Sequence, residues 1–76
     1  MEFTVGEPCP LIKSDVQSFM ALKASGYHLV DISDKLCLSK RTIERYYTKV
    51  INAFKARNLY HAISIAIHNK WIIPIA

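Results

Sequence analysis

The sequence has no hydrophobic run that approaches the roughly 20 residues of a membrane-spanning helix. Its first ten residues lack the basic start and the apolar stretch of a secretion signal. Cysteine is scarce as well, because Cys9 and Cys37 are the only two and neither has a partner at metal-ligand spacing. We therefore expect a cytoplasmic protein with reduced thiols and no bound metal.

Catalytic groupings are also missing. The sequence contains no carboxylate pair placed for acid–base chemistry, no nucleophile with a base, and no glycine-rich phosphate loop. His61 and His68 share one helical face but stand two turns apart, whereas zinc needs closer and more numerous ligands. A chain of 76 residues also has little room for a cleft. We expect neither an enzyme nor a cofactor.

The sequence does contain a large hydrophobic fraction and a concentrated positive charge. Hydrophobic residues make up 51% of the chain, which is enough for the core of one small domain. The net charge is −3 over residues 1–34, +6 over residues 35–57 and +1 over residues 58–76, which gives +4 in all. Such focused charge favours a polyanion such as nucleic acid, although an acidic protein or an anionic membrane would be attracted by the same field.

The most basic stretch, residues 39–57, has the period of a helix with two different faces. Apolar residues recur at helical spacing along one side: Ile43, Tyr47, Val50 and Phe54. Cationic and hydrogen-bonding residues repeat that spacing on the opposite side: Arg41, Arg45, Thr48 and Asn52. Ser39 stands where its hydroxyl can accept a backbone N–H of the first turn. One face suits burial and the other suits a DNA major groove; the alternative is a surface helix whose charges are merely solvated.

Two helices are predicted ahead of this stretch. The first begins at Ser14, which forms a capping-box pattern with Gln17, and ends near Ala24, before Gly26. Its inward residues are Val16, Phe19 and Met20. The second runs from about Leu29 to Leu36, with Leu29, Ile32, Ser33 and Leu36 on one side. A tight turn at Cys37 and Leu38 joins it to the basic helix, and this order makes a helix-turn-helix.

A fourth helix is predicted from Leu59 to about Lys70, capped by Asn58. Its inward face is Leu59, Ala62, Ile63, Ala66 and Ile67. Ile65 projects elsewhere, beside His61 and His68, where it would mark a dimer seam. The apolar tail from Trp71 must fold over the core or meet a partner.

The expected fold is therefore all-α, a compact four-helix domain containing a helix-turn-helix over residues 12–76. Residues 1–11 are expected to form an extended arm, because Gly6, Pro8 and Pro10 interrupt regular structure.

The segment from Ile12 to Ile72 resembles the C-terminal DNA-binding domain of LuxR-type (FixJ/NarL, GerE-like) bacterial transcription regulators. The resemblance is carried without gaps by Gly26, Ile32, Ser33, Leu36, Leu38, Ser39, Thr42, Ile43, Val50, Phe54 and Ala62. The chain departs from the family's Leu-Thr-x-Arg-Glu motif, where it has Ile12-Lys13-Ser14-Asp15-Val16, and has Ser18 in place of a second glutamate. Other departures are Lys23 for a core leucine, Tyr46 for a common histidine, and Lys55 for a glycine after the basic helix.

The resemblance implies that the basic helix enters the major groove of DNA. The expected base contacts are Arg45, Thr48, Glu44 and Arg41, and the expected phosphate contacts are Ser39, Lys40, Thr42, Tyr46 and Lys49. Arg45 is the leading base reader, since a guanidinium can bond to guanine O6 and N7 together. Glu44 either accepts from cytosine N4 or pairs with Lys40 or Thr48 to orient the helix.

The resemblance also implies a dimer formed through the last helix, with His61, Ile65, His68 and Trp71 as its expected contacts. The predicted function is sequence-specific DNA binding by a transcription regulator in the bacterial cytoplasm, associated with the nucleoid and not with a membrane. The alternative is an interaction module of the same fold that modulates another regulator or RNA polymerase. A heterodimer with a longer family member would combine the two.

Overall fold

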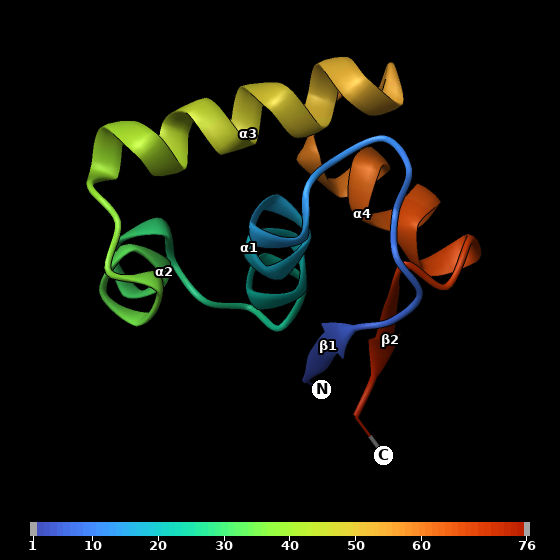
Figure 1. Cartoon of the computed structure of the whole chain (residues 1–76), viewed down its shortest axis with the longest axis horizontal. Coiled ribbons are helices and arrows are strands. Elements are labelled where there is room, and N and C mark those ends of the chain that lie inside the picture. Colours follow the sequence, from blue (N-terminus) through green and yellow to red (C-terminus); the bar gives the residue numbers. More distant parts are fainter. Residues whose placement is uncertain (1, 76) are drawn as a thin grey trace.

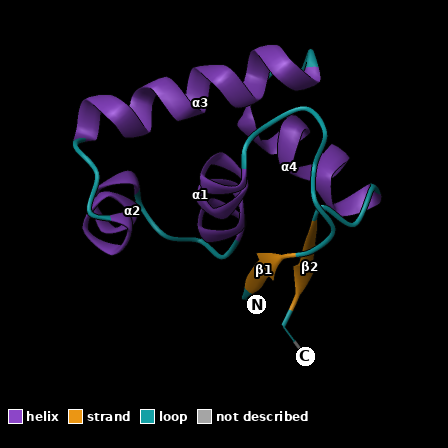
Figure 2. Ribbon diagram, viewed as in Figure 1, coloured by secondary structure: helices purple, strands orange, loops and turns teal. Residues whose placement is uncertain are grey.

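The computed structural model describes residues 2–75, which contain four helices and one two-stranded antiparallel sheet. In chain order the elements are β1 (Phe3–Val5), α1 (Ser14–Ala24), α2 (Leu29–Leu36), α3 (Lys40–Phe54), α4 (Leu59–His68) and β2 (Ile72–Pro74). The longest helix, α3, lies across one side, with α1 and α2 beneath it and the sheet at the opposite end (Figures 1 and 2). The predicted all-α, four-helix fold is confirmed, and the described helices include none long and apolar enough to span a bilayer.

The core draws its largest fully buried side chains from four different elements. These are Phe19 and Met20 of α1, Ile32 of α2, Ile43 and Val50 of α3, and Ile72 of β2. Burying an aliphatic or aromatic side chain of this size stabilises a fold by about 1.5–3 kcal/mol, so these contacts fix how the helices sit. The predicted inward residues Val16, Phe19 and Met20 are buried, as are Ile43, Val50 and Phe54 of the α3 stripe, while Tyr47 is half-buried.

The turn between α2 and α3 has the predicted helix-turn-helix form. Cys37 takes a left-handed backbone conformation with φ 55°, and the Leu38 N–H donates to the Ser33 carbonyl at 3.0 Å. The Ser33 hydroxyl also donates to the Leu38 carbonyl. Ser39 then caps α3, its hydroxyl accepting the Thr42 N–H at 3.2 Å. The small Ser33 side chain therefore holds the corner in place.

The helix α3 is shorter than predicted, since it ends at Phe54 and not at Arg57. Lys55 leaves the helix in a left-handed conformation with φ 52°, and its N–H donates to the Asn52 carbonyl at 3.3 Å. Glycine favours this conformation because it has no Cβ. Lys55, which stands where LuxR-type regulators have glycine, thus adopts a backbone conformation that suits glycine.

The capping-box prediction for α1 is wrong. Lys13 is the N-cap residue and makes no side-chain capping bond, while Ser14 is already helical. Gln17 is 2% exposed and bonds the carbonyls of Glu7 and Trp71 and the N–H of Cys9. Gln17 meets these groups because both ends of the chain pass over α1, and three such bonds outweigh one capping bond.

The predicted inward face of α4 is partly wrong. Leu59, Ala62 and Ala66 are buried and Ile63 is half-buried, but Ile67 is 39% exposed. Ile65, which was expected to project outward, is half-buried against the core. At about 100° per residue, Ile65 and Ile67 lie on opposite flanks of the buried stripe, and the fold covers the Ile65 flank. The helix is capped by Asn58 as predicted and ends at His68, two residues before Lys70.

The N-terminal arm and the C-terminal tail pair with each other. β1 and β2 align Thr4 with Ile73 and Val5 with Ile72, and the Ile75 N–H donates to the Glu2 carbonyl at 2.8 Å. On one edge of this two-stranded sheet, the Ser25 hydroxyl accepts the Phe3 N–H at 2.7 Å. On the other edge Pro74 has no N–H, so that edge has one donor fewer for pairing with another strand. Ile72 of the tail is buried in the core, whereas Ile73 and Ile75 are exposed, at 38% and 53%. Met1 and Ala76, at the ends of the predicted segments 1–11 and 12–76, lie outside the described residues.

Candidate nucleic-acid interface

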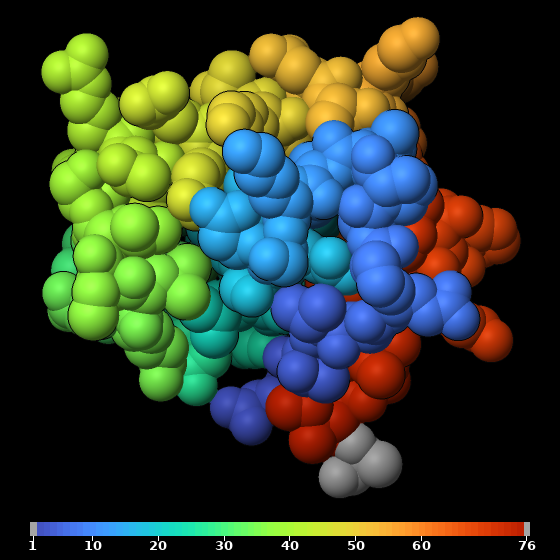
Figure 3. Space-filling model, viewed as in Figure 1, coloured from blue at the N-terminus to red at the C-terminus, as the bar shows by residue number. Residues whose placement is uncertain are grey.

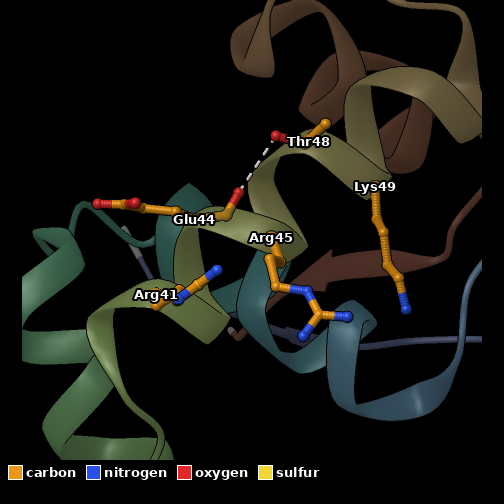
Figure 4. A pocket seen from close by; sticks show the side chains of 5 residues that line it. All are labelled: Arg41, Glu44, Arg45, Thr48 and Lys49. Atoms are coloured by element: carbon orange, nitrogen blue, oxygen red, sulfur yellow. Dashed lines mark hydrogen bonds between the residues drawn. The ribbon is translucent and has the colours of Figure 1, made fainter.

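The outward face of α3 carries the predicted base-contacting residues. Five of its side chains line one shallow hollow: Arg41, Glu44, Arg45, Thr48 and Lys49 (Figure 4). All five are exposed, as are Lys40 and Asn52 on the same helix. They are exposed because α3 buries the opposite stripe, and Figure 1 shows that no other element covers this side of α3. The structure therefore brings Arg41, Glu44, Arg45, Thr48 and Lys49 together on one accessible surface.

The charges on this surface are divided between two flanks. The carboxylate of Glu44 extends to one side of α3, whereas Arg45 and Lys49 extend toward another (Figure 4). The Thr48 hydroxyl donates to the backbone carbonyl of Glu44 at 3.3 Å and leaves the Glu44 carboxylate untouched. Pairing through Thr48 is therefore not what orients the Glu44 side chain. Both oxygen atoms of that carboxylate face solvent as hydrogen-bond acceptors.

Ser39 and Thr42, two expected phosphate contacts, serve first to start the helix. The hydroxyl of Ser39 accepts the Thr42 N–H and lies 3.0 Å from the Thr42 hydroxyl. Ser39 is exposed and Thr42 is half-buried at the end of the turn. Their capping role is established by these contacts, and phosphate binding by either one stays a prediction.

Tyr46 is placed differently from the other expected phosphate contacts. Its hydroxyl donates to the Asp15 carboxylate of α1 at 2.5 Å, and its ring meets Phe19 edge-on with centroids 6.2 Å apart. The hydrogen bond to Asp15, with some burial, raises the pKa of Tyr46. The same bond is the main cause of the lowered pKa of Asp15. Tyr46 thus ties α3 to α1, and its hydroxyl already donates a hydrogen bond to a carboxylate.

The Tyr46–Asp15 bond predicts a stability difference that depends on pH. A lowered Asp15 pKa contributes stability above the unfolded value of 3.8 that is lost as pH falls through the folded pKa. A raised Tyr46 pKa contributes stability below 10.0 that is lost as pH rises through the folded pKa. We expect Tyr46→Phe to lower the free energy of unfolding by about 0.5 kcal/mol at neutral pH, a modest value because water screens this exposed pair.

Urea denaturation of wild type and Tyr46→Phe at pH 7 and at pH 2.5 measures this difference. The gap between the two proteins should close in acid. Tyr47→Phe is the matched control, since Tyr47 is also half-buried on α3 but has no such carboxylate partner among the described residues. A gap of equal size at both pH values would refute the role given to Asp15.

The four expected dimer contacts do not form one exposed surface. His61 and His68 are exposed, and the His61 Nδ1 accepts the Arg57 N–H at 3.1 Å. Ile65 packs against the core, and the ring of Trp71 contacts Phe54 with centroids 5.4 Å apart. The exposed apolar residues of α4 are Tyr60 and Ile67, at 79% and 39%. Their spacing of seven residues puts them on one face, a signal that the sequence already contained.

Comparisons of the chain with protein-family models, with curated proteins and with solved structures find no match. A function for this chain therefore has to be argued from its own geometry. Among residues 2–75, no three His, Cys, Asp or Glu side chains are grouped so that they could hold a metal ion. The exposed face of α3, the second helix of the helix-turn-helix, brings three cationic side chains, Arg41, Arg45 and Lys49, to one hollow.

Proposed function

We propose that this chain is a sequence-specific DNA-binding transcription regulator that inserts α3 into the major groove. The observation that carries the proposal is the uncovered face of α3, where Arg41, Arg45 and Lys49 stand together with Thr48 and Glu44. At 1.5 Å per residue the helix is about 22 Å long, and a major groove about 12 Å wide admits a helix. We further propose that the domain is a divergent relative of the LuxR-type regulators that it resembles.

The division of charge on α3 suggests how bases are read. Arg45 can donate to guanine O6 and N7 together, and Glu44 can accept from cytosine N4. Because these neighbouring side chains extend to different sides of the helix, they reach different base pairs or different strands (Figure 4). Lys40 and Lys49 are suited to phosphates, which set the register of the protein on the duplex without reading its sequence.

Dimerisation on DNA is part of the proposal, with a revised surface. Tyr60 and Ile67 replace Ile65 and Trp71 as the apolar contacts, because the latter two are engaged with the core. A two-fold axis beside α4 would pair each Tyr60 with the partner's copy of this face, and the two α3 helices would then read an inverted repeat. The protein is proposed to act in a bacterial cytoplasm on the nucleoid.

A second candidate function is an interaction module for another regulator or for RNA polymerase. The observation that favours it is apolar exposure away from α3, at Val30 of α2 with 63% and Tyr60 of α4 with 79%. Single exposed apolar residues are common on protein surfaces, so they support this reading less than the α3 face supports DNA binding. Selection of bound sites from random DNA at two salt concentrations separates the two: a palindromic consensus supports the regulator, and no enrichment supports the module.

Two substitutions on α3 are expected to affect DNA binding differently. Arg45→Ala should weaken binding to the selected site by roughly 5- to 150-fold, equivalent to about 1–3 kcal/mol, and relax preference at one base pair. Lys49→Ala should weaken binding to all sequences alike and reduce the salt dependence. Fluorescence anisotropy with the selected and a scrambled duplex measures both effects. If both variants bind both duplexes as wild type does, docking through α3 is wrong.

A further inference from the structure

A second basic feature lies beside α3, in a groove between that helix and the segment that leads into α1. The groove has a volume of about 240 Å³ and is lined by Leu11, Ile12, Lys13, Val16, Lys49 and Ala53. Lys13 comes from the N-cap position of α1 and Lys49 from the middle of α3, so only the fold brings them to one groove. Figure 3 shows the segment around residues 10–15, in light blue, directly beside the yellow atoms of α3.

This groove shares one lining residue with the proposed base-reading surface. Lys49 lines both the groove and the hollow that holds Arg45 and Thr48. Arg45 and Lys49 extend from α3 toward this side, while Glu44 extends away from it (Figure 4). Arg45 and Lys49 therefore extend to one flank of α3, and Lys13 lines the groove beside that flank.

We infer that Lys13 and Lys49 together hold the sugar–phosphate backbone of one DNA strand where it passes the flank of α3; this inference rests on the proposed function. The chemistry of the groove fits that occupant. Two ammonium groups complement phosphate charge, and the apolar lining of Leu11, Ile12 and Val16 fits the faces of deoxyribose rings. Leu11 is half exposed, at 50%, and offers its surface to such a ring.

One carboxylate stands close to this site. Asp15 is not among the lining residues, and its oxygens accept hydrogen bonds from the Tyr46 hydroxyl and the Val16 N–H. The positive charge of Lys13 is one cause of the lowered Asp15 pKa. Asp15 therefore offsets part of the charge of Lys13. We expect the Lys13 contact to be equivalent to at most one neutralised phosphate.

Contacts through Lys13 and Lys49 would make the phosphate contacts unequal on the two strands that flank α3. Phosphate contacts on one strand run from Lys49 to Lys13, beside the base contact of Arg45, whereas the opposite flank of α3 carries the carboxylate of Glu44. Loss of Lys13 should thus remove contacts from one strand at the edge of the site and leave base preference unchanged.

The test is the salt dependence of binding to a fluorescent duplex of mixed sequence, measured for wild type, Lys13→Gln, Lys49→Gln and the double variant. Each lost phosphate contact lowers the slope of log affinity against log salt by about 0.9, so for each bound protomer we expect a decrease of about 0.9 for Lys49→Gln, at most about 0.9 for Lys13→Gln, and the sum of the two for the double variant. Lys35→Gln is the matched control: it removes the same charge from an exposed lysine whose ammonium lies 4.8 Å from the Tyr27 ring, on α2. Its slope should equal that of wild type.

The possible outcomes separate this inference from the proposed function. If wild type binds the duplex and Lys13→Gln behaves like Lys35→Gln, the groove is not a phosphate site and the inference alone is overturned. If wild type binds no DNA at any salt concentration, the proposed function fails and the inference fails with it. Phosphate-ethylation interference on the selected site adds a second readout, since Lys13→Gln should lose sensitivity on only one strand of each half-site.

Discussion

Gly6→Ala is expected to lower the free energy of unfolding by about 3 kcal/mol or more. A Cβ at this position would lie 2.3 Å from the carbonyl oxygen of Lys70, which is backbone and has no flexible end to move aside. The same carbonyl accepts the Glu7 N–H at 2.9 Å, and the Gly6 N–H donates to the Trp71 carbonyl at 2.9 Å. The added methyl group must therefore push the arm away from the tail and break both bonds. Urea denaturation monitored by circular dichroism measures the loss.

Gly26→Ala is the matched control for this substitution. Gly26 has φ +98°, a conformation that strains any residue with a Cβ, but nothing lies within 4 Å of the added atom. Its cost should be limited to backbone strain of roughly 1–2 kcal/mol. Hydrogen exchange adds a local readout, since Gly6→Ala should expose the Glu7 and Ile75 amides and Gly26→Ala should not. Equal losses with unchanged exchange at those amides would show that the contact with Lys70 is unimportant.

The helices could be predicted because their signals are local. Ser39 and Asn58 cap α3 and α4 as their side chains indicated, and α2 runs over the predicted residues Leu29–Leu36. Periodicity also identified the stripe of Ile43, Val50 and Phe54, since a helix repeats every 3.6 residues whatever surrounds it. The α3 surface followed directly, because its exposed face is the complement of that stripe.

Features that depend on distant residues could not be predicted in this way. The pairing of Phe3–Val5 with Ile72–Pro74 joins opposite ends of the chain through strands of three residues, too short to show alternation. The bond from Tyr46 to Asp15 likewise joins residues 31 positions apart. The groove shared by Lys13 and Lys49 arises only when α1 meets α3. In α4 the helical period made the flank of Ile65 and the flank of Ile67 equally suited to burial. The tertiary packing buries the flank that contains Ile65.

The capping-box pattern failed at Gln17 because the partners of this side chain are distant in the sequence. Ser14 and Gln17 have the spacing of a capping box, yet Gln17 is the one buried polar residue among residues 2–75. Its amide nitrogen donates to the carbonyls of Glu7 and Trp71, at 2.6 Å each, and its oxygen accepts the Cys9 N–H at 3.3 Å. One side chain of α1 thus holds the arm before it and the tail after α4. Leu11, at the end of the arm, and Ile12, directly after it, line the proposed phosphate groove, so this side chain also helps to position one wall of that groove.

We expect Gln17→Leu to lower the free energy of unfolding by about 2–4 kcal/mol, because it leaves three backbone groups without their partner. A domain of this size has a total of roughly 4–11 kcal/mol, so the loss is a large share. Gln17→Glu is nearly isosteric, but its carboxylate would face two carbonyl oxygens, which raises the pKa of the new side chain. The protonated form restores a donor, so this variant should be most stable below the unfolded pKa of about 4.3 and lose stability as pH rises through its folded pKa. Urea denaturation from pH 4 to pH 8 compares the three proteins. A Gln17→Glu curve parallel to that of wild type would contradict the assignment of these hydrogen bonds.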